Sequence, residues 1–139
     1  MNKSGILEYL EELEDKLFSL SEDLEVNFFI DEGENCCCDP YGDVWINPTF
    51  IQEVATTNSL AFSVVLNIVL AHELGHAMQI ISGLPGDNEV AAWTVGEELY
   101  KSLWGQLPSS FNSLKEELLN SYSEDNRYQT WLSEAESSS

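Results

Sequence analysis

Basic residues are scarce in this chain, which has only five lysines and arginines against 25 aspartates and glutamates. The formal net charge is -20 at pH 7. Proteins that bind the phosphate backbone of nucleic acids or an anionic membrane surface need clustered basic side chains. We therefore expect neither nucleic acid nor membrane among the partners. The acidic excess is compatible with attraction of metal cations and of basic substrates or partners, and it also serves solubility alone.

Long apolar segments are also absent. The longest apolar run, residues 60–71, covers 12 positions and is interrupted by Ser63 and Asn67. Such a run is too short to span a bilayer and is typical of a buried core helix. The N-terminus passes from Met1-Asn2-Lys3-Ser4 straight into an acidic amphipathic stretch, without the pattern of a secretory signal. We expect a cytoplasmic protein.

Histidine occurs only twice, and both residues lie in the motif His72-Glu73-Leu74-Gly75-His76. Residues i and i+4 share one face of a helix, so two imidazoles at this spacing can converge on one metal ion. Glu73 can then reach a water bound to that metal and act as general base. The alternative is a pair of core histidines beside a buried glutamate, which is unfavourable because a buried carboxylate needs a partner. The motif favours zinc, although other divalent ions also suit such ligands.

A third metal ligand must come from another residue type, because no histidine is left. The nearby acids are Asp87, Glu89, Glu97 and Glu98. Glu89 lies in the first turn of the helix expected to follow the motif helix, and a helix hairpin brings that turn back beside the motif. Asp87 is more typical of an N-cap, and Glu97 and Glu98 lie two turns further on. We predict Glu89 as the third ligand.

Hydrophobic periodicity predicts four or five helices and three short strands. We expect the long motif helix to be capped by Asn58 or Ser59 and to end at Gly83. Short turns between the strands favour a small antiparallel meander. The sequence therefore predicts one α+β domain, with a small antiparallel sheet packed on the central motif helix. The expected helices cover residues 6–20, 60–81, 87 or 88 to 104, and 111–122, with a short helix or a turn at 49–57, and the expected strands cover residues 25–31, 36–39 and 44–47.

The three cysteines are consecutive, at positions 36, 37 and 38. Neighbouring strand residues point to opposite faces, so three in a row cannot easily share one ion, and no Cys-x-x-Cys spacing occurs. We interpret them as small strand residues with reduced thiols. A second metal site, a redox site, or a cysteine as third zinc ligand are the alternatives.

A resemblance adds to this reading. His72-Glu73-Leu74-Gly75-His76, followed by Glu89-x-x-Ala92-x-x-Val95-Gly96-x-x-Leu99, resembles the gluzincin-like metallopeptidases of the ImmA/IrrE type over roughly residues 44–100. Related small HExxH families of phages and bacteria fit nearly as well. The resemblance implies a minimal zincin-like domain, expected over residues 1–133. The acidic, serine-rich composition of residues 134–139 predicts a disordered tail. It implies zinc bound by His72, His76 and Glu89, with Glu73 as the catalytic base.

The leading functional hypothesis is a zinc-dependent metallopeptidase that hydrolyses a protein or peptide substrate. The substrate would lie extended along an edge strand at residues 44–46. No further histidine and no obvious arginine is available to stabilise the oxyanion; a tyrosine could do so, and the sequence does not choose among Tyr41, Tyr100 and Tyr122. Two other hypotheses are a non-catalytic zinc-containing binding or regulatory protein, and an acidic decoy or inhibitor of a basic partner. Only the first needs Glu73, and only the first two need the histidines.

Overall fold

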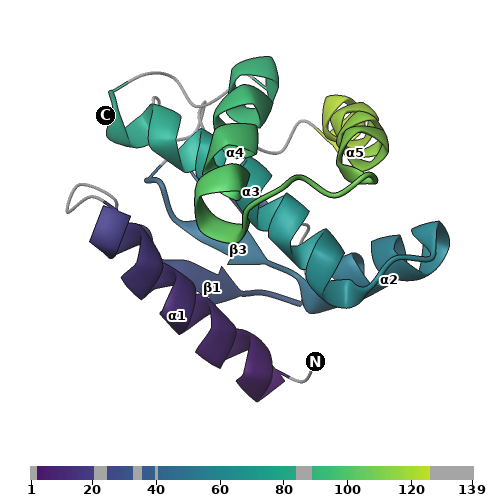
Figure 1. Cartoon of the computed structure of the whole chain (residues 1–139), viewed down its shortest axis with the longest axis horizontal. Coiled ribbons are helices and arrows are strands. Elements are labelled where there is room, and N and C mark those ends of the chain that lie inside the picture. The colour runs from purple at the N-terminus through teal and green to yellow at the C-terminus, as the bar shows by residue number, and fades with distance from the viewer. Residues whose placement is uncertain (1–2, 21–24, 33–35, 40, 84–88, 126–139) are drawn as a thin grey trace.

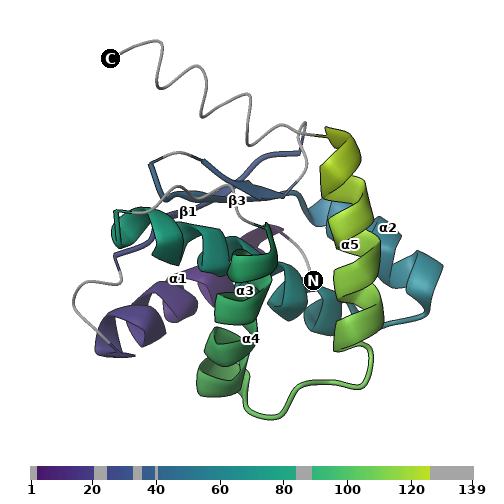
Figure 2. The same ribbon diagram turned by 90° about the horizontal axis from the view of Figure 1, so that it is seen from above.

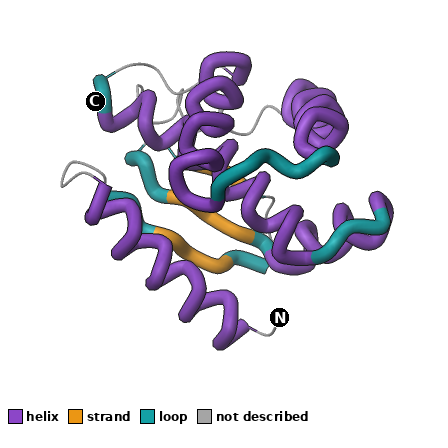
Figure 3. Tube along the Cα trace, in the orientation of Figure 1, coloured by secondary structure: helices purple, strands orange, loops and turns teal. Residues whose placement is uncertain are grey.

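The computed structural model describes residues 3–20, 25–32, 36–39, 41–83 and 89–125 (Figure 1). Within these ranges the chain forms five helices and three short strands, so the predicted α+β class is confirmed (Figure 3). The predicted domain limit at residue 133 and the predicted tail lie outside them. In chain order the elements are α1 (Lys3–Leu20), β1 (Phe28–Ile30), β2 (Cys37–Cys38), β3 (Val44–Ile46), α2 (Pro48–Asn58), α3 (Phe62–Ile81), α4 (Glu89–Trp104) and α5 (Phe111–Asp125).

The three strands form a mixed sheet in the order β1-β3-β2. β1 pairs with β3 in parallel, and β2 pairs with β3 antiparallel. The predicted antiparallel meander is therefore wrong, and so is the prediction that residues 44–46 form an edge strand. Val44 and Ile46 are at most 1% exposed. The central position buries this apolar strand between two neighbours, which the meander would not have done.

The two faces of the sheet differ in exposure. Phe28, Val44 and Ile46 point to the buried face. On the opposite face Phe29 and Trp45 stack with ring centroids 4.7 Å apart, and Phe29 is 40% exposed. Figure 2 shows α1 and α3 on the same side of the sheet, where α1 contacts β1 and α3 contacts β2 and β3. The sheet is thus covered by helices on one face, as its alternating burial requires.

Helix α1 covers the sheet with an apolar stripe. Its inward side chains are at most 3% exposed and recur at three- and four-residue steps. The periodicity also placed Leu7 and Leu20 on this stripe, but they are 42% and 52% exposed. Its acidic residues lie mainly on the exposed face. Burial of this stripe, rather than intrinsic helix propensity, holds the helix in place. The buried side chains are Ile6, Leu10, Leu13 and Leu17.

The start of α3 differs from the prediction, whereas its end agrees with it. Asn58 is the last residue of α2, and Ser59 caps the C-terminus of α2 in the left-handed conformation, with φ of 55°. α3 begins after Ala61 without a side-chain cap. Ser59 closes α2 in this conformation, so it does not serve as the N-cap of α3, whose buried residues begin at Val65. Gly83 has φ of 79° and its N–H donates to the carbonyl of Ile80, which is the predicted glycine stop.

Helix α3 runs through the centre of the domain. By length and composition it could cross a membrane, but 72% of its most apolar window is buried inside the protein. Core helices of globular domains have this character.

Helices α3 and α4 pack with their backbones in contact. A Cβ atom placed on Gly75 would lie 2.0 Å from the carbonyl oxygen of Ala92, and one placed on Gly96 would lie 2.6 Å from that of Ala71. Real side chains do not approach so closely, so only glycine fits at either position. This contact fixes how α4 lies along the motif helix.

Candidate metal centre

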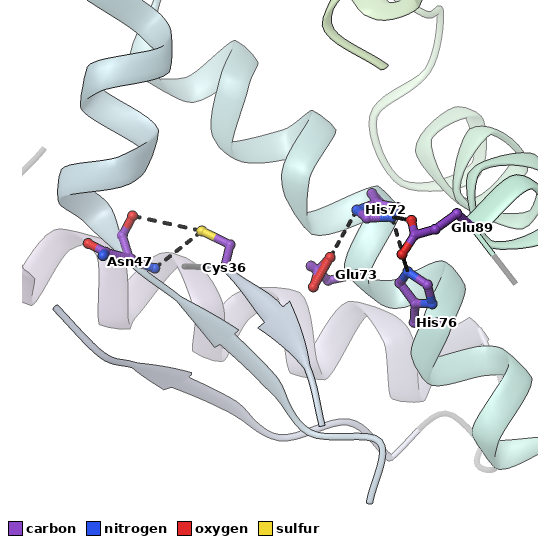
Figure 4. Close-up of polar contacts among 6 residues, drawn as sticks. All are labelled: Cys36, Asn47, His72, Glu73, His76 and Glu89. Atoms are coloured by element: carbon purple, nitrogen blue, oxygen red, sulfur yellow. Dashed lines mark hydrogen bonds and ion pairs between the residues drawn. The ribbon is translucent and has the colours of Figure 1, made fainter. Parts of the chain in front are cut away.

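The motif residues occupy the buried middle of α3. His72, Glu73 and His76 are at most 2% exposed. The Nε2 atoms of the two histidines lie 3.1 Å apart, as expected for imidazoles one helical turn apart that point at one place (Figure 4). The spacing of the motif therefore produces the predicted convergence.

Glu89, the first residue of α4, completes the convergence (Figure 4). Its Oε2 lies 2.7 Å from Nε2 of His72, and its Oε1 lies 3.1 Å from Nε2 of His76. Its side chain is 28% exposed, so the group opens toward solvent on this side. The other acidic residues considered as third ligand do not contact the histidines in the described part of the chain. Glu97 and Glu98 pair with Lys101 on the outer side of α4, and Asp87 lies outside the described residues.

The three donor atoms fit a tetrahedral zinc ion. Zinc binds imidazole nitrogen and carboxylate oxygen at about 2.0–2.2 Å, so neighbouring ligand atoms of a tetrahedron lie about 3.3 Å apart. The two Nε2 atoms lie 3.1 Å apart, and each lies 2.7–3.1 Å from a different carboxylate oxygen of Glu89, so the spacing of the donors is close to that of neighbouring zinc ligands. Small side-chain adjustments of a few tenths of an ångström would seat the ion. Two imidazoles and one carboxylate are also the ligand set of several catalytic zinc sites.

Glu73 lies beside this donor set rather than within it. Its Oε1 is 2.9 Å from Nδ1 of His72, the ring nitrogen that faces away from Glu89. One donor atom from each of His72, Glu73 and His76 nevertheless lies within 4.8 Å of the others. Glu73 therefore belongs to the same cluster of potential ligands, and its carboxylate contacts the side of the His72 ring that is remote from Glu89.

The carboxylates and imidazoles of the site shift one another's pKa values. Burial on its own would lower the pKa of His72, but the carboxylates of Glu73 and Glu89 outweigh it and raise that pKa to about 9. Burial would raise the pKa of Glu89, but hydrogen bonds and charge from both histidines outweigh it and lower that pKa to about 2. Two carboxylates thus flank His72, an arrangement that favours positive charge on this imidazole or on a cation beside it.

Trp93 forms one wall of the site. Its indole stacks on the imidazole of His72 with centroids 4.3 Å apart and planes 12° apart, and it is fully buried. This contact was not predicted from the sequence. The signal was present, because Trp93 follows Glu89 by four residues and so lies on the same face of α4 as the predicted ligand.

The cysteines lie in and beside β2, next to the site but outside its donor set. Cys36 and Cys38 are at most 1% exposed. The backbone N–H of Asn47 donates to Sγ of Cys36 at 3.3 Å, and burial raises the pKa of the Cys36 thiol well above its ordinary value. A protonated thiol is a poor metal ligand. These observations agree with small strand residues, and the side chain of Cys37 lies outside the described ones.

The three candidate tyrosines differ in position. Tyr100 is 6% exposed and packs against Trp104 and Phe111, three turns along α4 from Glu89. Tyr41 is 80% exposed in the turn between β2 and β3. The side chain of Tyr122 lies outside the described ones. Burial away from Glu89 removes Tyr100 from consideration as the oxyanion donor.

Comparisons of this chain with protein-family models, with curated proteins and with solved structures find no match.

Proposed function

We propose that this chain is a zinc-dependent metallopeptidase, similar in its motif to the gluzincin-like ImmA/IrrE type. The observation that carries the proposal is the convergence of His72, His76 and Glu89, whose donor atoms lie 2.7–3.1 Å apart on two packed helices. Rigid helices preorganise such a site better than loops do. The charge of -20 would favour metal uptake and basic peptide substrates.

Each residue then has a chemical role. Bound zinc would supply Lewis-acid polarisation of the scissile carbonyl and would lower the pKa of a coordinated water toward neutrality. Glu73 accepts the proton that the attacking water loses and passes it to the leaving amine. His72, His76 and Glu89 hold the ion, and the partly exposed side of Glu89 leaves an approach for the substrate.

The substrate would add to β2, not to β3 as expected from the sequence. Within the described part of the chain β2 pairs with β3 alone, which leaves its outer edge for another strand. β2 also contacts α3, and Cys36, just before β2, lies near Glu73 in Figure 4. A peptide that paired with β2 would therefore run past the metal centre. Main-chain hydrogen bonds would hold it extended.

One distance favours a second candidate function. The 2.9 Å contact between Glu73 Oε1 and His72 Nδ1 has the form of a carboxylate that orients a metal-binding histidine. A protein that uses Glu73 only in this way would be a non-catalytic zinc-containing binding or regulatory protein. The third candidate, an acidic decoy or inhibitor of a basic partner, is supported by the charge alone.

Zinc content and peptide hydrolysis, measured on matched variants, separate these candidates. The wild type should hold about one zinc per chain and cleave basic peptides. Glu73→Gln should keep the zinc and lose at least about 100-fold in turnover. Glu89→Ala should lose zinc, whereas Glu98→Ala, an exposed acid of the same helix, should behave as wild type.

Each contrary result selects another candidate. Undiminished peptide cleavage by Glu73→Gln would contradict the role of Glu73 as general base. Zinc binding without hydrolysis of any peptide offered would favour the non-catalytic protein. A wild-type chain that takes up no zinc when zinc is supplied would leave the acidic binding protein as the leading candidate.

A further inference from the structure

The imidazole of His72 is enclosed on three sides. Nε2 faces Glu89 and His76, and Nδ1 faces Glu73. The flat face of the ring lies on Trp93, nearly parallel to the indole. The polar contacts involve the ring nitrogens at the edge of the ring, whereas the stacking contact covers its flat face and opposes rotation out of the plane.

From this arrangement we propose that Trp93 is a positioning residue for the zinc ligand His72, and that it increases zinc affinity by stacking on the imidazole. The inference rests on the proposed zinc site and extends it to a residue that does not touch the ion. Trp93 acts through His72 alone.

Helix α4 carries both the proposed ligand Glu89 and the stacking residue Trp93. Glu89 and Trp93 are four residues apart and share one face of the helix. The backbone contact at Gly96 sets how deeply this face lies against α3. Phe111 of α5 meets the indole edge-on, with centroids 5.8 Å apart and planes 88° apart. Trp93 is fully buried and contacts a second ring as well as His72, so its rotation is restricted.

Two physical effects favour zinc binding in this arrangement. A fixed ring plane keeps Nε2 directed at the ion, so less side-chain freedom is lost when the ion binds. The indole face is electron-rich, and an imidazole that ligates a dication becomes more positive, so the stacking strengthens when zinc binds. A tryptophan that merely filled the core would stabilise the fold without changing zinc affinity in the folded protein.

The first experiment measures zinc dissociation constants by competition with a chelator. Trp93→Leu should weaken zinc binding about 10- to 100-fold, the range typical of residues that support metal ligands, and Trp93→Phe should recover part of the loss. Trp104→Leu is the matched control, since Trp104 ends the same helix and packs on Tyr100. It should stay within about twofold of wild type. Absorption spectra of the cobalt-substituted proteins should shift for Trp93→Leu alone.

A second measurement avoids any change of shape. Replacing tryptophan by fluorinated tryptophan withdraws electron density from the indole face and keeps the fold. Zinc affinity should fall about two- to fivefold, and this fall should vanish in the Trp93→Phe background. If Trp93→Leu does not fold, this measurement tests whether Trp93 supports zinc binding.

Three results would overturn the proposal. The first is a folded Trp93→Leu protein with wild-type zinc affinity. The second is an equal loss of affinity in Trp93→Leu and Trp104→Leu, which would indicate general packing. The third, decisive where Trp93→Leu is unfolded, is no effect of fluorination. In each of them the wild type still binds zinc, which distinguishes this failure from failure of the proposed function, where the wild type binds none.

Discussion

Helix α3 contacts α4 and the sheet in two different ways. Against α4 the contact is between backbones, at Gly75 and Gly96. Against the sheet it is made by buried side chains such as Val44 and Ile46. When one side chain in an interface changes, its neighbours can adopt other rotamers and fill the space. Two backbones in contact cannot adjust in this way, because only a shift of a whole helix separates them. The position of Glu89 relative to the histidines should therefore depend strictly on the helix pair and only weakly on the sheet.

The largest loss of stability and of zinc affinity should come from Gly75→Ala. The new methyl group would meet the carbonyl of Ala92 at 2.0 Å, so the helices must separate. We expect a loss of about 3 kcal/mol in the free energy of unfolding, the upper part of the usual range for overpacking. Glu89 would move away with α4, so zinc affinity should fall together with stability. Urea unfolding of the metal-free protein and zinc competition measure the two quantities.

Gly105→Ala is the control for this substitution. Gly105 has φ of 90°, and a Cβ atom there would meet nothing within 4 Å. The change should cost about 1 kcal/mol through backbone strain and leave zinc affinity unaltered. If Gly75→Ala retained wild-type zinc affinity, the helix contact would not be what positions Glu89.

A smaller effect is expected on the sheet side, from Asp39→Ala. The Asp39 carboxylate accepts hydrogen bonds from the backbone N–H groups of Tyr41 and Asp43 and from Nε1 of Trp45, at 2.9–3.0 Å. Losing them should cost about 2 kcal/mol of stability, because hydrogen bonds to a charged acceptor are among the stronger ones. Zinc affinity should stay within about twofold of wild type. A parallel loss of zinc affinity would show that the sheet positions the ligands as well.

The same contrast explains what the sequence could predict. The motif histidines converge because of a local helical repeat, and α1 follows from an apolar stripe within 18 residues. Glu89 could be predicted because a short connection between two helices brings the first turn of α4 beside the end of α3. Each of these inferences uses only geometry that one helix or one hairpin determines.

The sheet could not be predicted in this way. Whether β1 lies parallel to β3 depends on which strand gains most from the central position, and this is a property of the whole core. Ser59 lies between two helices, and its left-handed backbone conformation closes α2, which the residue type alone does not indicate. The stacking of Trp93 on His72 depends on the depth of the α3–α4 contact, which sequence spacing does not give.

The smallest effect is expected from Lys101→Ala, on the outer face of α4. The Lys101 ammonium lies 3.6 Å from Glu98 and 4.0 Å from Glu97, and all three side chains are at least 35% exposed. Exposed pairs of this kind contribute a few tenths of a kcal/mol, so the free energy of unfolding should change by less than about 0.5 kcal/mol. Zinc affinity should not change, because the glycine contacts lie on the opposite side of the helix. A measurable drop in zinc affinity would mean that charge on the outer face, and not only the inner face of α4, controls the centre.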